Sequence, residues 1–379
     1  MTKTPKFLVR ASLVAVMVAL GSLSGPGTPA TANDEEGVVY TLSNAAAGNA
    51  VLVFHRAEDG SLTPGDPVLT DGLGSGGSLG NQGAVVLSDD HNWLLAVNAG
   101  SNNISVFQVE NGDLTLTDLV PSGGTEPISV TIYKDLVYVL NDGGPDGGTA
   151  NISGFQLDSN GELAPLLGST RLLSTGAPDA AQIEFSPNGK MLVVTEKATN
   201  MISVYPVDQD GLAHGPITQL SNGATPFGFA FDHLNRIFVS EARGGAPDGA
   251  AVTAYRVAGN GDLSILDGSE PTQETAACWV VVTHDGRYAY VTNTGSGTIT
   301  GFSIAGNGDL TPLDDDGITA GEAGRAPLDA AISYDNRFLY VLNSGTDQVN
   351  GYAIEEDGSL TSLPDPVAVL DGSNGLAAK

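Results

Sequence analysis

The sequence predicts an all-β fold, a seven-bladed β-propeller with four antiparallel strands per blade, and two observations support this. A polar residue that follows an apolar run recurs seven times, at intervals of 43 to 55 residues. Each copy continues into a strand around one aromatic residue, and a further short apolar segment separates the copies. A period of roughly 50 residues with four strands in each copy is typical of a propeller, whose blades stack around a central channel.

The repeats align on the polar residue that ends the second strand of each blade. In chain order these residues are Asn44, Asn98, Asn141, Glu196, Glu241, Asn293 and Asn343. The aromatic residues of the next strand are Phe54, Phe107, Phe155, Tyr205, Tyr255, Phe302 and Tyr352. Turns rich in Asn, Asp and Gly follow, such as Asn111-Gly112, because these residues tolerate the positive φ of a tight hairpin.

The short apolar segments between the copies are predicted to be the innermost strands. They cover residues 84–87, 129–132, 182–185, 228–231, 280–283 and 330–333. The first copy has no such segment before Val38, whereas residues 372–378 resemble one after the last copy. We expect this tail to complete the first blade and close the ring, because an open ring would leave two unpaired sheet edges.

Residues 1–32 are predicted to be a secretory signal peptide, and residues 33–379 a single propeller domain. The signal combines a basic start, an apolar stretch at 11–20 and the small residues Ala30-Thr31-Ala32. We therefore expect export to a periplasm, the cell surface or the medium, without membrane insertion. The lone Cys278 excludes an internal disulfide and is expected to be a small buried residue.

The chain is strongly acidic, with 15 Lys and Arg residues against 44 Asp and Glu residues and a net charge of −29. Nucleic-acid binding is excluded, because it depends on basic residues that neutralise phosphates. The acidity favours a soluble exported surface, with cation binding by the acidic loops as the alternative. We expect a monomer whose partner is a small polar ligand.

Several motifs resemble those of a known family. They are Tyr-Val-Thr-Asn at 290–293, Ser-Pro-Asn-Gly-Lys at 186–190 and Gly-Asn-Gly-Asp-Leu at 306–310. Over residues 38–378 the chain resembles the lactonase-type seven-bladed propellers, which include 6-phosphogluconolactonases and proteins with Tyr-Val-Thr-Asn repeats. The resemblance implies a hydrolase with His, Glu and Arg side chains at the channel mouth. This sequence departs from that pattern, because Asp179 stands where a His after Pro would be expected.

Two copies break the Asn pattern and supply the predicted catalytic residues. Glu196 and Glu241 replace Asn in consecutive blades, and paired carboxylates can provide a general base or hold a divalent cation. Lactone hydrolysis also needs a positive charge near the developing oxyanion, for which Arg243 and Arg325 are the candidates. The structural alternative is that Glu196 and Glu241 pair with Lys197 and Arg243.

A second set of residues is predicted to bind the ligand at the mouth. It contains Gln82, Asn98, Asn141, Asp179, Trp279, Asn293, Asp329 and Asn343. For the Asn residues the alternative is a structural role at the turn, and for Trp279 it is packing inside the channel. No cofactor is predicted and no metal ligands are assigned, although calcium bound by the Asn and Glu ring is an alternative.

Three Gly-rich loops complete the prediction. The insertions 142–148 and 243–249 are near-copies and should form a rim for ligands around the mouth, the alternative being flexible Gly-rich loops that bind no ligand. The run 72–83 lacks the Lys-Ser/Thr ending of a phosphate-binding loop. The sequence thus favours an exported lactonase-family propeller that binds a small sugar lactone or related cyclic ester at the channel mouth and acts on it as a carboxylic ester hydrolase. The alternative is a non-catalytic binding propeller.

Overall fold

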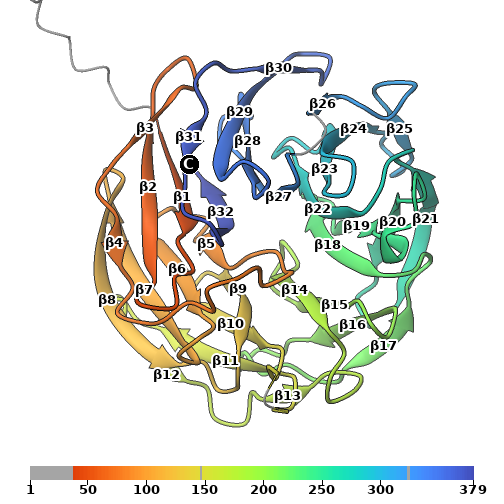
Figure 1. Ribbon diagram of the computed structural model, residues 1–379. Helices are drawn as coiled ribbons and strands as arrows, with labels where there is room; N and C mark the ends of the chain where they lie inside the picture. Colours follow the sequence, from red (N-terminus) through yellow and green to blue (C-terminus); the bar gives the residue numbers. More distant parts are fainter. Residues whose placement is uncertain (1–36, 146, 322–324) are drawn as a thin grey trace, which may run out of the picture. The chain divides into compact units, whose positions relative to one another are not determined.

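The computed structural model describes residues 37–379 except 146 and 322–324, and these belong to one compact unit, Asp34–Lys379. The predicted signal peptide lies outside the described residues. Seven antiparallel sheets surround a common centre, as Figure 1 shows. The predicted seven-bladed propeller is confirmed.

Each blade runs from an innermost strand at the channel to an outer strand at the rim. The innermost strands are β5 (Val85–Leu87), β9 (Pro127–Tyr133), β14 (Ala180–Phe185), β18 (Pro226–Phe231), β22 (Ala277–Val282), β27 (Pro327–Ile332) and β32 (Asn374–Ala378). The second strands are β1 (Gly37–Leu42), β6 (Trp93–Asn98), β10 (Leu136–Asn141), β15 (Met191–Glu196), β19 (Arg236–Glu241), β23 (Tyr288–Asn293) and β28 (Phe338–Asn343). Six of the seven aligned polar residues thus end a second strand, and Asn44 follows β1 by two residues.

The third strands carry the aligned aromatic residues. They are β2 (Ala50–Arg56), β7 (Asn103–Glu110), β11 (Asn151–Leu157), β16 (Met201–Pro206), β20 (Ala251–Val257), β24 (Thr298–Ile304) and β29 (Gln348–Ile354). The continuous outer strands are β8 (Asp113–Pro121), β17 (Ile217–Leu220) and β21 (Leu263–Pro271). One short 3-10 helix, η1 (Arg243–Gly245), follows β19.

The outer strand is divided into two pieces in the other four blades. The pieces are β3 (Leu62–Pro64) with β4 (Val68–Leu69), β12 (Leu163–Pro165) with β13 (Arg171–Leu172), β25 (Leu310–Pro312) with β26 (Ala320–Gly321), and β30 (Leu360–Ser362) with β31 (Val367–Ala368). In three of them a proline ends the first piece. Proline has no N–H to donate to a sheet, so it is tolerated only at an edge of this kind.

The second strands form the centre of each blade, and those of six blades are buried along their whole length. Several of them carry a tyrosine whose hydroxyl donates to a glycine carbonyl in the outer turn of the next blade. Tyr40 reaches Gly112 at 2.8 Å and Tyr340 reaches Gly60 at 2.7 Å. Both glycines have positive φ, and a Cβ at either would overlap a side chain of the tyrosine's own blade. Glycine is therefore required at these turns, and the bonds fasten neighbouring blades.

The ring is closed as the sequence predicts. β32 pairs antiparallel with β1, with Tyr40 opposite Ala377 and Val39 opposite Ala378. The first blade is thus assembled from both ends of the described chain. Its sheet has no unpaired inner edge at β1, which removes a site for non-native strand pairing.

Candidate functional site

The two faces of the propeller follow from the direction of its strands. Each innermost strand begins, and each second strand ends, on the face that we call the mouth face. The hairpins that carry Asp89, Asp232, Asp285 and Asp335 lie on the opposite face, because the strands of every blade are antiparallel. All twelve residues predicted as a site were expected on or near the mouth face.

The aligned Asn residues are buried within their own blades. Asn98 is fully buried, donates to Ser105 Oγ at 2.8 Å, and accepts from Thr70 Oγ1 at 2.7 Å. Thr70 belongs to the loop that arrives from the preceding blade. Asn141 bonds the carbonyl of Ser122 in the corresponding loop, at 3.3 Å. The predicted structural role at the turn is thus visible, and it includes holding the crossover loop between blades.

Asn293 and Asn343 follow the same pattern. Asn293 donates to the hydroxyls of Thr298 and Thr300, at 3.2 and 2.8 Å. Asn343 donates to Asn350 Oδ1 at 2.9 Å. Both are at most 2% exposed. A ligand at the mouth would reach these amides only after displacing bonds within the blade.

Glu196 takes the Asn position in the fourth blade and is completely buried. Its Oε1 accepts from the Ser174 N–H at 3.2 Å and from Ser203 Oγ at 2.6 Å. Its Oε2 accepts from the hydroxyls of Ser174 and of Thr199, the latter at 2.9 Å. The pairing with Lys197 considered from the sequence is not formed, because Lys197 turns to Asp179 instead.

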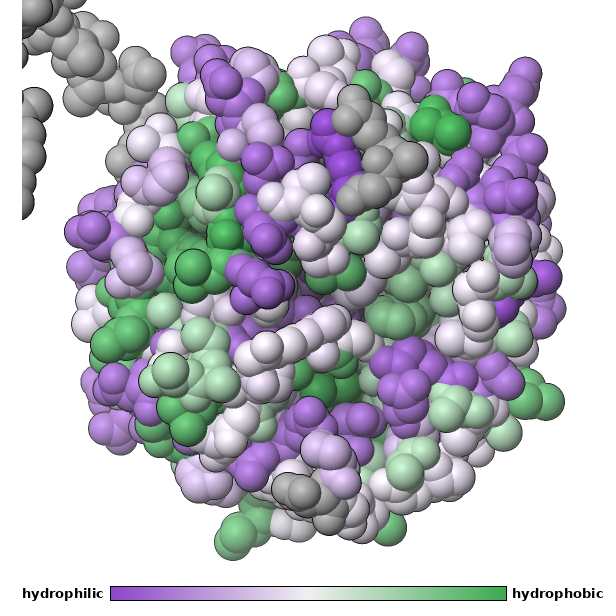
Figure 2. Space-filling model, viewed as in Figure 1, coloured by the Kyte–Doolittle hydropathy of each residue, from purple (hydrophilic) through white to green (hydrophobic). Residues whose placement is uncertain are grey.

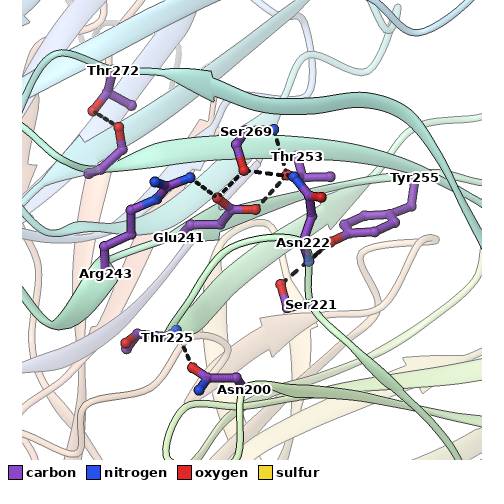
Figure 3. A network of polar contacts seen from close by, with 11 residues as sticks. Asn200, Ser221, Asn222, Thr225, Glu241, Arg243, Thr253, Tyr255, Ser269 and Thr272 are labelled. Carbon is purple, nitrogen blue, oxygen red and sulfur yellow. Dashed lines mark hydrogen bonds and ion pairs between the residues drawn. The ribbon is translucent and has the colours of Figure 1, made fainter.

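Glu241 occupies the same position in the fifth blade, and Figure 3 shows its polar neighbours. It is fully buried and accepts from the hydroxyls of Thr253 and Ser269, the latter at 2.7 Å. Arg243, from η1, closes the group with a 3.1 Å ion pair to Oε2. The predicted Glu241–Arg243 pairing is therefore present. Gly223 leaves room for this carboxylate, since a Cβ there would overlap it.

The Gly-rich run 72–83 crosses the mouth face toward the channel, where it appears in orange before β5 in Figure 1. Its last part, residues 79–83, is called the plug. The Asn81 amide donates to the Ile128 carbonyl, and the Asn81 carbonyl accepts from Trp279 Nε1 at 2.6 Å. Gln82 pairs with the backbone of Val280, donating at 2.8 Å and accepting at 3.2 Å. The plug thereby joins blades on different sides of the channel and covers its end.

Figure 2, drawn from the same side, shows weakly polar residues over the centre, where this run lies. Gln82 is 8% exposed and Trp279 is 2% exposed. Both were predicted to bind the ligand. In the structure their polar atoms form hydrogen bonds of the plug, and the Trp279 ring lies 4.9 Å from that of Phe227.

One group of charged side chains lies beside the plug, and we call Glu126, Asp142, Asp179 and Lys197 the Lys197 cluster. The Lys197 side chain is 9% exposed and its Nζ lies 3.1 Å from Asp179 Oδ1. Nζ also donates to the carbonyls of Gly80, at 2.5 Å, and Ala180, at 3.2 Å. The 62% exposed side chain of Asp179 faces solvent at the mouth. Lys197 therefore links the plug to the start of β14.

Asp142 is the half-buried member of this cluster. Its Oδ1 accepts from the Ala180 N–H at 2.8 Å. Burial raises the pKa of Asp142 to about 6, against the lowering effects of that bond and of Lys197, while Asp179 and Glu126 add to the rise. Burial also raises the pKa of Glu126. A carboxyl group with a pKa near 6 is ionised at neutral pH and still basic enough to accept a proton.

Beneath the plug, the channel forms a cavity of about 500 Å³. Its wall runs from Gln82 and Asp329 to Asp89, His233 and His284 on the opposite face. All seven innermost strands contribute to it. The channel therefore opens away from the mouth face, on the side where His233 and His284 lie.

Two of the carboxyl groups that line this cavity have strongly raised pKa values. Asp329, a predicted ligand residue on β27, is 2% exposed, and burial raises its pKa to about 7. Glu184 on β14 has its pKa raised to about 8 by burial and, less strongly, by Asp89, while a backbone hydrogen bond from Phe231 opposes the rise. Asp329 thus belongs to the channel and not to the rim of the mouth.

Arg325 is half-buried just before β27, and its backbone carbonyl accepts from the Gly345 N–H at 2.9 Å. Cys278 is buried as expected, and burial raises the pKa of its thiol to about 11. Within residues 37–379, apart from the four undescribed ones, no group of three or more His, Cys, Asp or Glu side chains is placed to hold a metal ion. No helix in the same part of the chain is long and apolar enough to span a membrane.

The family description "Lactonase, 7-bladed beta-propeller" matches residues 31–167 and 235–374, well over half of the chain. The chain belongs to this lactonase family. The resemblance seen in the repeat motifs is thereby confirmed.

Curated relatives in this lactonase family include the 6-phosphogluconolactonase of Yersinia pestis. It is 24% identical over 155 residues, and the match covers 39% of this chain and 44% of that relative. The chain therefore matches less than half the length of the curated relatives. A protein of Lactobacillus plantarum superposes with a TM-score of 0.72 at 18% identity, covering 91% of this chain and 99% of that one.

A second structural neighbour is described as the periplasmic gluconolactonase of Pseudomonas aeruginosa. Its TM-score is 0.68 at 18% identity, with 90% of this chain and 99% of that one covered. At these identities the solved structures show a shared fold. The chemistry of this lactonase-family propeller has to be argued from its own residues.

Sequence reasoning did not select Asp142 or Lys197 as site residues. Each directly follows an aligned position, Asn141 and Glu196, where the strand has ended and the side chain is free to turn toward the channel. The signal was present in the repeat itself. The corresponding residues of the other blades are Ala45, Ala99, Ala242, Thr294 and Ser344, so a charge immediately after the aligned position distinguishes these two blades.

Proposed function

We propose that this protein is a lactonase-type hydrolase that binds a small, uncharged sugar lactone or related cyclic ester at the mouth face. Family membership and relatives named as lactonases support the reaction class. The observation that carries the proposal is the Lys197 cluster, in which the half-buried Asp142 lies within electrostatic range of a buried cation. The net charge of −29 favours an uncharged lactone over a phosphorylated one.

In the proposed reaction, Asp142 is the general base. Its carboxylate takes a proton from a water molecule, and the water oxygen forms a bond to the lactone carbonyl carbon. The tetrahedral oxyanion then collapses, the ring C–O bond breaks, and the proton held by Asp142 passes to the leaving alkoxide. The product is the open hydroxy acid, so no other reactant is needed.

Lys197 supplies positive charge at this position. Its three N–H donors contact Gly80, Ala180 and Asp179. Only the last of these partners is an exposed side chain, so a substrate carbonyl at the mouth would compete with Asp179 for Lys197. Stabilisation of an oxyanion by a fixed charge in a partly desolvated position is among the largest catalytic effects.

Glu196 and Glu241 remain predictions as catalytic residues. Their oxygens accept hydrogen bonds from within the propeller, and both side chains are completely buried. We propose that they hold the crossover loops in place, as the Asn residues do in the other blades. Variants of both residues belong in the same activity test as those of the Lys197 cluster.

A non-catalytic binding propeller is the second candidate function. Two observations favour it. The Lys197 ammonium group already has three partners, and Asp179 stands at the position where the family pattern leads one to expect a histidine. In this case the cluster and the loop 142–148 would bind a polar ligand without hydrolysing it. Export of the protein, by the signal peptide expected at residues 1–32, is proposed for both functions.

The deciding experiment measures proton release from a panel of sugar and aliphatic lactones. Purified residues 33–379 are compared with the variants Asp142→Asn, Lys197→Met, Glu196→Gln and Glu241→Gln, and with Asp210→Asn as an exposed control of the same chemistry. We expect Asp142→Asn to lower kcat/KM by about 10²-fold or more. The kcat/KM of the unaltered protein should rise with pH through about 6, where Asp142 ionises.

Assays with added calcium and with a chelator decide whether a metal ion takes part in the hydrolysis. Activity that survives chelation excludes the calcium alternative. Loss of activity in Glu241→Gln but not in Asp142→Asn would place the catalytic centre at Glu241 and contradict the role of Asp142 as the general base. No turnover across the panel would favour the binding propeller.

A further inference from the structure

The channel cavity and the Lys197 cluster lie on opposite sides of the plug, and the cavity opens on the face opposite the mouth. It is therefore separate from the proposed active site. We propose that it binds a small linear organic diammonium ion, held at its two ends by Asp329 and Glu184. This inference does not rest on the proposed lactonase activity.

The first observation concerns the charge of the wall. The cavity lining contains Asp89, Glu184, Asp232 and Asp329, and no Lys or Arg is among the described residues that line it. Asp232 is neutralised by a 2.6 Å ion pair with Arg236. Burial holds the pKa of Asp329 at about 7 and that of Glu184 at about 8, so above these values the two groups are ionised and make the channel unfavourable for anions and favourable for cations.

The second observation is a buried acceptor with no partner. Asp329 is 98% removed from solvent, and its Oδ1 accepts from the Ala330 N–H at 3.0 Å. Its Oδ2 accepts no hydrogen bond from the described residues, although the amides of Gly83 and Leu376 lie near enough to lower its pKa slightly. An unsatisfied buried carboxylate oxygen is costly, and an ammonium group would satisfy both its charge and its hydrogen-bonding capacity.

The third observation is the position of Glu184. Its Oε2 accepts from Gln182 Nε2 at 2.9 Å, and the same amide also donates to the Phe229 carbonyl. β14 and β27 are separated by the strands β18 and β22 around the ring, so Glu184 and Asp329 lie on different sides of the channel. A ligand with a positive charge at each end can contact both walls, whereas a single ammonium group would contact one.

The size and composition of the cavity fit such a ligand. Small-molecule sites occupy roughly 300–1,000 Å³, and the cavity measures about 500 Å³. Its wall also contains Val85, Val130, Ile183 and Val280, which suit the methylene chain of a diamine. A metal ion is a poorer fit, because the described residues provide no group of three ligating side chains.

The test is a titration of the protein with putrescine by isothermal calorimetry at a pH above about 8, where both Asp329 and Glu184 are ionised. The comparison ligands have the same chain length and differ in their ends: n-butylamine has one ammonium group, butanediol none, and succinate two negative charges. We expect putrescine to bind with a stoichiometry of one and butylamine to bind with an affinity lower by about tenfold or more. Butanediol and succinate should not bind.

The protein variants are Asp329→Asn and Glu184→Gln, each of which should weaken putrescine binding by about tenfold or more. Asp210→Asn removes an exposed carboxylate elsewhere and should leave the affinity unchanged. If Asp329→Asn fails to fold, Glu184→Gln alone decides. Unfolding midpoints of each variant identify such a failure.

Three outcomes would overturn the proposal. The first is the absence of putrescine binding to the unaltered protein. The second is equal affinity in the unaltered protein and in the folded cavity variants, or binding that disappears at high salt, both of which indicate attraction to the acidic surface. The third is butanediol binding as tightly as putrescine, which would make the cavity a site for neutral hydroxyl compounds.

Discussion

Glu196 and Asp329 are both carboxylates and both at most 2% exposed, yet their surroundings differ completely. Glu196 accepts four hydrogen bonds, three of them from hydroxyl groups. Asp329 accepts one bond within 3.5 Å, from Ala330, and its second oxygen has no partner among the described residues. Burial alone therefore does not identify a functional carboxylate, because the number of donors around it determines what it can still bind.

The largest expected effect comes from removing β32, the strand that closes the ring. The backbone amide of Leu376 in this strand lies near Asp329, whereas no hydrogen bond described above joins β32 to Glu196 or Glu241. Deletion of residues 372–379 removes β32 and exposes the inner edge of β1. We expect a loss of more than about 5 kcal/mol, most of the stability of a typical domain. Thermal and urea unfolding measure it, and an unchanged midpoint would contradict the closure seen here.

The next effect separates the two carboxylates. Glu196→Leu leaves four donors, that of Ser203 buried and those of Ser174 and Thr199 partly buried, without this acceptor and should cost about 3–5 kcal/mol in free energy of unfolding. Glu196→Gln retains one carbonyl oxygen and should cost less, about 1–2 kcal/mol. Urea unfolding of both variants gives the comparison. Equal stability of Glu196→Leu and the unaltered protein would show that these bonds contribute nothing net.

Ionised Asp329, in contrast to Glu196, should lower the stability of the folded protein. Its pKa is about 7 in the folded protein and 3.8 ordinarily, so between these values the folded state holds a proton that the unfolded state has lost. Stability from this group therefore falls as pH rises from about 4 to about 7, by at most on the order of 4 kcal/mol. Asp329→Asn removes the titration and should flatten this part of the stability curve.

The matching control for that measurement is Asp210→Asn, which should leave the slope unchanged. Urea unfolding at several pH values between 4 and 8 measures both, since these values span the expected window. A variant of Asp329 with the same slope as the unaltered protein would show that its carboxyl group is not desolvated in the folded state.

The smallest effect concerns Arg243, the only charged partner among the hydrogen-bonded neighbours of Glu241 in Figure 3. Its side chain is 38% exposed, so its ion pair is screened by water and salt. Arg243→Ala should cost less than about 1 kcal/mol, because Thr253 and Ser269 still satisfy Glu241. A loss comparable to that of Glu196→Leu would show that the charge of Arg243, and not the hydroxyls, holds this carboxylate.

The repeat made the fold predictable. Period, turn residues and the strand-like tail at 372–378 are local features, and the structure has seven sheets with β32 paired to β1. The aligned Asn positions were also placed correctly at strand ends. The repeat period and the turns depend on residues close together in sequence, and the distant pairing of β32 with β1 was predictable because the first copy lacks an innermost strand that the tail resembles.

The candidate site was less predictable. The plug could not be foreseen, because Gln82 and Asn81 bond residues about 200 positions away or in other blades, and no pattern in the sequence marks such contacts. Asp142 and Lys197 come together for the same reason, from strands of adjacent blades. The orphaned Oδ2 of Asp329 is a property of packing in three dimensions. Sequence could indicate which residue types face the channel, but not which of them are left without partners.

The pairing of β32 with β1 gives every blade two neighbours. A linear array of repeats can lose its terminal repeat first and shorten by steps, because its two ends are held on one side only. A closed ring has no terminal repeat, so opening any one boundary between blades leaves all the others intact but exposes two sheet faces at once. Unfolding of this propeller is therefore expected to be all-or-none, with hydrogen exchange of the seven second strands occurring at one common free energy.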